Sequence, residues 1–491
     1  MKHYDLIIIG GGPSGYAGAM RALDFKKKVL LIEKTKIGGA GIYDGVLTSK
    51  TLWEYSLKVS SIREMIPEYE VNYNDIVKTV NEAAFERKTQ MSVHLQLLQK
   101  QTDNLLDYEK GLASFVDKNT ISIKKEDGSI KKVTADNILI ASGSRPRYLP
   151  NIPIDEHIIL TSNGVKNLTE IPKSMVVLGA GVIGCEFATI FSNLGKTKVY
   201  LIDKADRILP FEDEDVAEVV SENLEKQGAF IHHGASLKRM EVKDGEVEYE
   251  LEYKDGKTEI FRVEKALVSV GRVANIEGLN LEAVGVKLNE RGSIWDDDTQ
   301  THISNIYAAG DVTTDIALVN VGEREARHAV VRMFGPTIKP LSYQNISTIM
   351  FLNPEVASVG MNEQDCVKKG LAHKVVKLDY STNARAIAMR KTKGFFKIIV
   401  TNDNGMRILG MRAVGEHASS AIQAVAYLIH TNQGIRELAD MMHPHPSIIE
   451  GIQECLRMLL GKSIYKSSVF KDKLKCYVCE NGTCTNVETL V

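Results

Sequence analysis

The chain has 491 residues, of which 44% are hydrophobic and 25% are charged. Its formal net charge is −2, and the basic residues are scattered along the chain, which argues against nucleic acid or a membrane surface as a partner. The first apolar run is short and ends in glycines, so we expect neither a signal peptide nor a membrane span and predict a cytoplasmic location.

Residues 4–34 predict a strand, a glycine-rich turn, a helix and a second strand. The turn reads Gly10-x-Gly12-x-x-Gly15, and the second strand ends at Glu33. The first glycine permits a tight turn, the second lets the backbone approach a pyrophosphate, and the third lets the helix pack against the strand. An acidic residue at this spacing accepts hydrogen bonds from ribose hydroxyls. The segment therefore predicts dinucleotide binding at a helix N-terminus.

The same pattern recurs in residues 174–204. Here the turn reads Gly179-x-Gly181-x-x-Gly184, and the second strand ends at Asp203. Two such units imply two dinucleotides, as a redox flavoprotein with a bound flavin and a diffusible nicotinamide requires.

The acid at the end of this strand bears on the choice of nicotinamide. Asp203 would repel the 2′-phosphate of NADP, which favours NAD, whereas Lys204 and Arg207 lie close enough to weaken that preference.

The last segment, beyond about residue 462, places Cys479 and Cys484 on either side of Glu-Asn-Gly-Thr. Asn-Gly between two short extended runs is a strong hairpin signal, so we expect these cysteines to lie together. From residue 462 to Cys479 the chain would span on the order of 55 Å if extended. A disordered tail is one alternative. Another is a metal site that adds Cys476 to the pair. It would lack the fourth ligand of a structural zinc site unless a histidine elsewhere supplied it, and we predict no metal.

These motifs together resemble the flavoprotein disulfide reductases with two dinucleotide-binding folds, the family of the dihydrolipoamide dehydrogenases. The likeness runs from residue 4 to about residue 461. Further blocks in family order are ASGSRP, SVGRVANIEGLNLE, AAGDV, PEVASVG and HPHPSIIE.

The resemblance implies FAD and NAD(H) as cofactors, with NADH as a substrate. It also implies a homodimer. The residues that it assigns to FAD are Gly10, Gly12, Gly15, Glu33, Lys50, Gly143 and Asp311, and those that it assigns to NAD are Gly179, Gly181, Gly184, Asp203 and Gly271.

The resemblance also implies four catalytic residues. His445 is the acid or base that reaches the partner subunit's active site, and Glu450 orients it. Lys50 lies near the flavin ring and pairs with Glu186 on a helix of the NAD domain. A carboxylate bonded to one imidazole nitrogen fixes the tautomer and makes the other nitrogen more basic, which suits proton transfer near neutral pH.

The resemblance fails at one place, the stretch GGAGIYDGVLTSK (residues 38–50). Family members keep a redox-active cysteine pair where this chain has Gly41 and Val46. Neither residue can form a disulfide or a thiolate. We therefore interpret the chain as an FAD-dependent NAD(P)H oxidoreductase that passes electrons from NADH through FAD directly to an unidentified non-disulfide acceptor. A quinone, a second nicotinamide and an electron carrier are the candidates.

Two alternatives remain open. In the first, Cys479 and Cys484 replace the lost pair as the relay of a disulfide reductase of the dihydrolipoamide type. In the second, the chain is a non-catalytic flavin-binding subunit. The retention of Lys50, Glu186 and the His445 dyad argues against that second alternative.

The predicted fold class is α/β, with two Rossmann-like domains for FAD and NAD and a C-terminal α+β dimerisation domain. The expected boundaries are 1–148 for the first part of the FAD domain, 149–271 for the NAD domain, 272–342 for a central segment, 343–465 for the dimerisation domain and 466–491 for a cysteine-containing tail.

Overall fold

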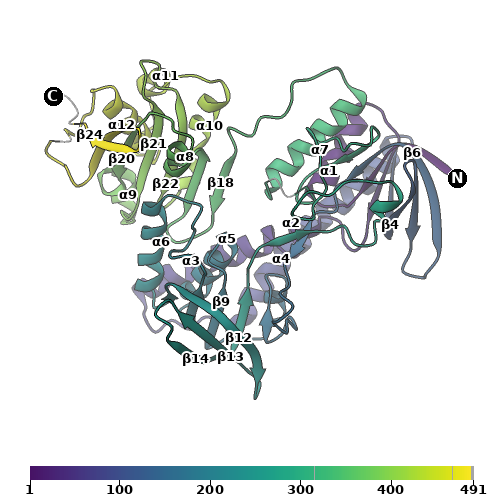
Figure 1. Cartoon of the computed structure of the whole chain (residues 1–491), viewed down its shortest axis with the longest axis horizontal. Helices are drawn as coiled ribbons and strands as arrows, with labels where there is room; N and C mark the ends of the chain where they lie inside the picture. The colour runs from purple at the N-terminus through teal and green to yellow at the C-terminus, as the bar shows by residue number, and fades with distance from the viewer. Residues whose placement is uncertain (314–315, 467, 488–491) are drawn as a thin grey trace. The chain divides into compact units, whose positions relative to one another are not determined.

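The structure is a computed structural model that describes residues 1–313, 316–466 and 468–487 (Figure 1). It divides into two compact units. The first comprises residues 1–55, 70–170 and 269–341, and the second comprises residues 56–69, 171–268 and 342–491. Parts of the predicted central segment and tail, residues 314–315, 467 and 488–491, lie outside the described residues.

A mainly parallel sheet forms the centre of the first unit. Its strands follow the order β3-β2-β1-β6-β5-β4, and β17 pairs with β6 as well. The strands are β1 (Lys2–Ile9), β2 (Val29–Glu33), β3 (Leu106–Lys110), β4 (Leu112–Asp117), β5 (Thr120–Lys124), β6 (Ile130–Ile140) and β17 (Ile306–Ala308).

Both faces of this sheet are buried, because successive side chains of a strand point to opposite sides. On β1, Leu6 and Ile8 join a core with the helices α1, α4 and α7, whereas Ile7 and Ile9 join a second core with the central segment. Figure 1 shows α1 and α7 packed against each other. The helices are α1 (Pro13–Asp24), α2 (Gly39–Ile42), α3 (Val46–Met65, which continues into the second unit), α4 (Tyr73–Gln101) and α7 (Val319–Phe334).

Short strands complete the first unit. β7 (Ser144–Pro146) pairs in antiparallel fashion with β16 (Arg272–Ala274), which joins the ends of two segments that are distant in sequence. β8 covers Ile159–Leu160.

The second unit begins with another parallel sheet. Its strands include β11-β10-β9-β15, in that order. Between β11 and β15 the chain forms an antiparallel sheet in the order β12-β13-β14. The turn between β13 and β14 contains Lys254, Asp255 and Gly256. The elements are β9 (Ser174–Leu178), α5 (Val182–Leu194), β10 (Lys198–Ile202), α6 (Glu214–Lys226), β11 (Phe230–His232), β12 (Ala235–Lys243), β13 (Glu246–Tyr253), β14 (Thr258–Val263) and β15 (Lys265–Val268).

The C-terminal part of the second unit is an α+β layer. Its sheet has the order β18-β19-β22-β21-β20-β23-β24. An apolar core lies between this sheet and the helices α10 to α12. The elements are β18 (Ser347–Met350), β19 (Val356–Gly360), α8 (Glu363–Lys368), β20 (His373–Asp379), α9 (Ala384–Met389), β21 (Phe395–Thr401), β22 (Ile408–Val414), α10 (Gln423–His430), α11 (Arg436–Asp440), α12 (Glu450–Leu459), β23 (Leu474–Glu480) and β24 (Thr483–Asn486).

The cysteine-containing tail is part of this sheet. Residues Leu474–Cys479 of β23 pair in antiparallel fashion with His373–Leu378 of β20, and β24 forms the outer edge (Figure 1). Over its described length, the tail is therefore not an extended, unpaired segment. No helix in the described part of the chain combines the length and the apolar character that a membrane span requires.

Candidate active site

In the first glycine-rich turn, neighbouring backbone atoms leave no room for a side chain at two of the three glycines. A Cβ at Gly10, whose φ is +110°, would overlap the carbonyl oxygen of Ala141, and a Cβ at Gly15 would overlap that of Gly10. A Cβ at Gly12 would meet nothing within 4 Å. Packing thus requires the first and third glycines, whereas the second keeps open the space that a pyrophosphate would take.

The second turn shares two features with the first. Gly179 has a φ of +100°, and a Cβ at Gly181 would again meet nothing within 4 Å. Gly184 is buried in the first turn of α5. Both α1 and α5 begin without a side-chain cap among the described residues, so their first N–H groups are available to an anion.

The acidic residue after each turn holds that turn in place. The Gly11 N–H donates to Glu33 Oε2 at 2.7 Å, and the Ala180 N–H donates to Asp203 Oδ2 at 2.6 Å. The second oxygen of Glu33 accepts from the Thr35 N–H, also at 2.7 Å. These bonds fix the carboxylates beside the turns, where each retains lone pairs for a ribose hydroxyl.

Apart from Lys50, the remaining residues assigned to cofactors lie at the β7–β16 junction of the first unit. The Ser144 hydroxyl donates to Asp311 Oδ2 at 2.6 Å, and Arg272 Nε donates to Ser144 Oγ at 2.7 Å. Gly143 and Gly271 both have positive φ, +71° and +101°. The two open turns, the uncapped N-termini of α1 and α5, and the hydrogen-bonded series of Asp311, Ser144 and Arg272 fit the binding of two dinucleotides.

Lys50 and Glu186, the predicted ion pair, lie in different units. Lys50 is on α3 in the first unit, and Glu186 is buried on α5 in the second, where Oε1 accepts from the Phe351 N–H at 3.1 Å. Their pairing stays a prediction.

His445 and Glu450 meet within the second unit. His445 Nδ1 lies 2.7 Å from Glu450 Oε1, and the Ser447 N–H donates to Glu450 Oε2 at 2.8 Å. Partial burial raises the pKa of Glu450, but the bonds from Ser447 and His445 lower it more, so the net pKa lies below that of a free glutamate. Because a carboxylate accepts, Nδ1 carries a proton. The His445 side chain is 70% exposed, so its other nitrogen is open to a reacting group.

The C-terminal hairpin holds a disulfide between Cys479 and Cys484. Asn481 and Gly482 both have positive φ, as a two-residue turn of this type needs, and the cysteines occupy facing positions of β23 and β24. Their Cα atoms are 4.1 Å apart, the close spacing of a pair that does not exchange backbone hydrogen bonds. Cys479 is buried and Cys484 is exposed. The predicted hairpin is therefore present.

The other thiols are poor candidates for chemistry. Cys185, Cys366 and Cys455 are buried, and burial raises the pKa of each, to about 11 for Cys366. Burial also raises the pKa of the half-buried Cys476. Thiols of high pKa carry little thiolate at neutral pH, so the hairpin pair stands out among the cysteines.

The loop at residues 38–50 contains no thiol and leaves little room for one at the first position. A Cβ at Gly41 would lie 2.7 Å from Pro13 Cγ, and Pro13 is the first residue of α1. Val46 begins α3.

Comparison with known proteins identifies the family of this chain. Residues 4–326 match the model of the pyridine nucleotide-disulphide oxidoreductases, and residues 346–456 match the dimerisation domain of the same group. The dihydrolipoyl dehydrogenase of Geobacillus stearothermophilus is 33% identical over 466 residues, which cover 94% of this chain and 97% of that protein. The dihydrolipoamide dehydrogenase of Chaetomium thermophilum is 32% identical over 468 residues, covering 94% and 92%.

Solved structures of similar proteins superpose on most of this chain. LpdA from Mycobacterium tuberculosis superposes with a TM-score of 0.84 at 27% identity, covering 94% of this chain and all of that one. A Cu(II) complex of the HOCl-induced flavoprotein disulfide reductase RclA from Escherichia coli gives a TM-score of 0.83 at 25% identity, with 94% of this chain covered.

The chain belongs to the pyridine nucleotide-disulphide oxidoreductase family. It is an FAD-dependent pyridine nucleotide oxidoreductase, and its family uses FAD and NAD(H). The predicted fold class is confirmed, and the matched dimerisation domain fits a homodimer. The alternative of a non-catalytic subunit is wrong.

The prediction of direct electron transfer to a non-disulfide acceptor is also wrong. The similar proteins are dihydrolipoyl dehydrogenases and disulfide reductases, and the chain has a Cys479–Cys484 disulfide. The main interpretation took the absence of cysteines at Gly41 and Val46 to mean that electrons leave FAD without a disulfide relay. The alternative, with Cys479 and Cys484 as the relay, fits the similar proteins better. The cross-strand geometry of the hairpin supplies a disulfide elsewhere.

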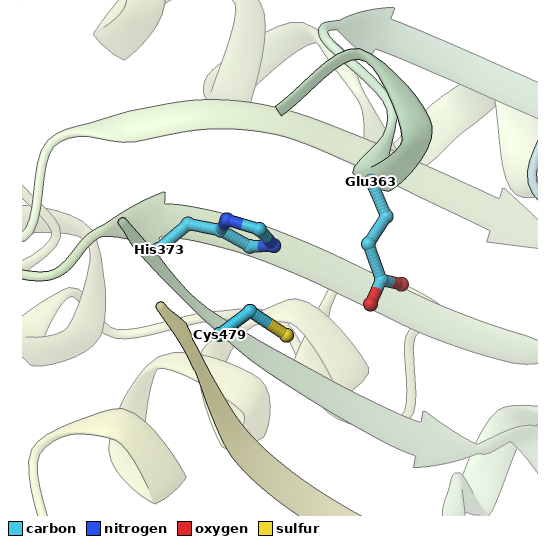
Figure 2. A group of neighbouring side chains, drawn as sticks. All are labelled: Glu363, His373 and Cys479. Atoms are coloured by element: carbon cyan, nitrogen blue, oxygen red, sulfur yellow. The ribbon is translucent and has the colours of Figure 1, made fainter. Parts of the chain in front are cut away.

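Sequence reasoning missed one group of side chains beside the hairpin. Glu363, His373 and Cys479 present ligand atoms that all lie within 4.8 Å of one another (Figure 2). A single histidine in a strand of alternating polar and apolar residues does not by itself predict a metal site. The neighbours of His373 come from segments that are distant in sequence.

Proposed function

We propose that the chain is a disulfide reductase of the dihydrolipoyl dehydrogenase type in which Cys479 and Cys484 form the redox pair. The observation that carries this proposal is the disulfide across β23 and β24, with one buried and one exposed sulfur. The family's usual pair is replaced by Gly41 and Val46, and Pro13 crowds the first of these positions.

The chemistry balances on this chain's own sulfurs. FAD, when bound, would take a hydride from NADH and supply an electron pair to a disulfide. Reduction of the Cys479–Cys484 bond consumes that pair with two protons, one derived from the hydride and one from solvent, and gives two thiols. Cys484 then loses its proton to a base, and its thiolate attacks a disulfide substrate such as lipoamide, whose leaving sulfur takes up a proton. Cys479, deprotonated in turn, attacks the mixed disulfide, which restores the hairpin bond, and the second substrate sulfur takes up a proton to complete the dithiol product. The same steps in reverse oxidise a dithiol.

His445 and Glu450 serve this exchange by holding a proton. Each thiolate that leaves a disulfide needs a proton to become a thiol. Nδ1 is tied to Glu450 Oε1 at 2.7 Å, so the opposite ring nitrogen gives or takes that proton. The role of Lys50 and Glu186 as a pair beside the flavin belongs to this proposal as well.

The nicotinamide that we propose is NAD. Asp203, fixed by the Ala180 N–H, would place a negative charge beside the 2′-position of the adenosine ribose. We also keep the cytoplasm as the expected location. Disulfides that occur in that compartment are usually catalytic or redox-sensing, which agrees with a relay.

The test is NADH-dependent reduction of lipoamide by the FAD-loaded protein. Substitution of both hairpin cysteines, Cys479→Ser with Cys484→Ser, should lower the rate by at least about 100-fold, because the other thiols are buried or half-buried and have raised pKa values. Bleaching of the flavin by NADH should be unchanged. Cys476→Ser, on the same strand, is the matched control and should keep the activity. Lipoamide reduction that survives the double substitution would contradict the proposal.

A further inference from the structure

His373, buried on β20, has a ring nitrogen without a partner. The side chain is 1% exposed. Nδ1 lies 2.7 Å from the carbonyl oxygen of Leu371, and because a carbonyl only accepts, Nδ1 is the donor. The neutral ring therefore carries a lone pair on Nε2, which has no hydrogen-bond partner among the described residues. A buried polar atom left unsatisfied is costly, so this nitrogen calls for an explanation.

Two further ligand atoms lie beside this nitrogen. Cys479 faces His373 across the β20–β23 ladder, and Glu363 begins α8 next to them. Figure 2 shows the three side chains converging from these separate elements. The ligand atoms of the three side chains all lie within 4.8 Å of one another. In a tetrahedral zinc site, bonds of about 2.0–2.3 Å place ligand atoms roughly 3.3–3.8 Å apart, so a contraction of about 1 Å would close this group around an ion.

The hydrogen bond of Nδ1 matches a feature of metal sites. A metal-binding histidine usually donates its other ring N–H to a carboxylate or a backbone carbonyl, which fixes the ring and leaves the correct nitrogen free. The carbonyl of Leu371 does this for His373. Glu363 is held as well. Its Oε2 pairs with the Lys397 ammonium at 2.6 Å and accepts a hydrogen bond from the Tyr477 hydroxyl at 2.9 Å. Oε1 is therefore the oxygen that would bind a cation.

The charge around this group also suits a cation. Lys397 contacts Asp213 at 3.0 Å and Asp215 at 3.3 Å in addition to Glu363, and Lys377 contacts Asp215 at 2.9 Å. The carboxylates of this network outnumber its ammonium groups by one. A Cys479 thiolate would add a second uncompensated negative charge, which a divalent cation would neutralise.

We propose that the reduced hairpin binds Zn²⁺ through Cys479 Sγ, His373 Nε2 and a carboxylate oxygen of Glu363. The fourth position falls to Cys484 or to water, as in zinc sites with three protein ligands. The disulfide excludes this state, because its sulfur is not a thiolate. Reduction by an external phosphine breaks the S–S bond, converts the phosphine to its oxide with oxygen from water, and gives a thiol at each cysteine. Zinc then displaces the proton of the Cys479 thiol.

Such a site would make the hairpin a zinc-dependent redox element. A ligand that binds only the reduced form stabilises that form by mass action. Zinc would therefore slow reoxidation of the hairpin in proportion to its occupancy. The inference requires only a reducible disulfide, so it does not depend on electrons arriving from the flavin.

The experiment is calorimetric titration of the full, FAD-loaded chain with ZnCl₂. The protein is compared before and after reduction by a phosphine, which has no thiol to compete for metal. The reduced protein should bind about one more zinc ion per chain than the oxidised protein. With Co²⁺ as the probe, the extra site should give a thiolate-to-metal charge-transfer band. Equal zinc uptake by the two forms would overturn the proposal.

Variants locate the site. Cys479→Ser, His373→Gln and Glu363→Gln should each weaken the extra site by at least about tenfold, whereas Cys476→Ser should leave it intact. Cys484→Ser provides a second, independent reading, because it changes only an exposed side chain and frees Cys479. This variant should bind zinc without any reductant. Undiminished binding by Cys479→Ser, or no reductant-independent binding by Cys484→Ser, would contradict the assignment.

Discussion

His445 and Glu450 form a hydrogen-bonded dyad, with Nδ1 and Oε1 2.7 Å apart at the start of α12. Nδ1 is held by the carboxylate, and the His445 side chain is 70% exposed. If this nitrogen moves the proton of the exchange, His445→Gln should lower kcat by about 10²–10⁴. The spectrum of the bound flavin should not change. Stopped-flow reduction by NADH is the control, because that half-reaction precedes the thiol chemistry. A kcat within about threefold of the unsubstituted enzyme would remove His445 from the mechanism.

The lowered pKa of Glu450 predicts a pH-dependent contribution to stability. A carboxyl group whose folded pKa lies below its unfolded value, about 4.3, stabilises the protein above that value and loses this contribution as the pH falls through the folded pKa. Glu450→Gln should therefore lower the free energy of unfolding at pH 7, and the difference should shrink in acid. Urea unfolding at several pH values measures it. A difference independent of pH would show that the carboxylate charge is not involved.

The open space at Gly12 and Gly181 predicts two separable binding defects. Gly12→Ala should lower FAD affinity by at least about tenfold, because the added methyl group takes the place of the pyrophosphate and meets no protein atom within 4 Å. Gly181→Ala should raise the KM for NADH while FAD stays bound. Measuring flavin content and steady-state kinetics for both variants separates the two sites. A Gly12→Ala protein with full FAD would contradict the assignment of the first turn.

The glycines show how far local sequence predicts this molecule. Gly15 packs against Gly10, and Glu33 binds the Gly11 N–H, within one strand–turn–helix–strand unit, so their spacing alone predicts the arrangement. The contact of Gly10 with Ala141 comes from a distant strand and is not visible in this spacing. The Asn481-Gly482 turn is equally local, and it predicts the pairing of its flanking cysteines.

The rest depends on contacts between distant segments. Nothing in the tail itself predicts that β23 pairs with β20, so the place of the tail at the edge of this sheet could not be predicted from its sequence. The same limit hid the neighbourhood of His373, because its partners lie on α8 and β23. The absence of cysteines at Gly41 and Val46 favoured direct electron transfer over the hairpin relay, and that preference gave the wrong electron acceptor.

The close approach of Gly41 to Pro13 predicts a cost for any side chain at that position. Gly41→Ala places a Cβ 2.7 Å from Pro13 Cγ and should lower the free energy of unfolding by about 1–3 kcal/mol. Pro13→Ala should recover part of this loss when it is combined with Gly41→Ala. Urea denaturation of both single variants and the double variant gives the coupling energy. Additive effects would show that the two positions do not interact.

Lys397 offers a test of the charge network beside the hairpin. Its side chain is 3% exposed and contacts Asp213, Asp215 and Glu363. Lys397→Met leaves these carboxylates without their shared cation and should lower the free energy of unfolding by about 3–5 kcal/mol. Lys393→Met, which breaks an exposed pair with Glu222, is the control and should cost less than about 1 kcal/mol. Similar losses for the two variants would contradict the network's role.

The role of the hairpin disulfide is tested by a count of the electrons that each subunit accepts through its flavin. The FAD-loaded protein is titrated anaerobically with NADH, while flavin absorbance and newly formed thiols are followed. If the disulfide is the relay, each subunit should take up about four electrons, shared between FAD and the Cys479–Cys484 disulfide, and about two in the Cys479→Ser, Cys484→Ser variant. Uptake of about two electrons by the unsubstituted protein, with no new thiols, would show that the hairpin disulfide takes no part in electron transfer.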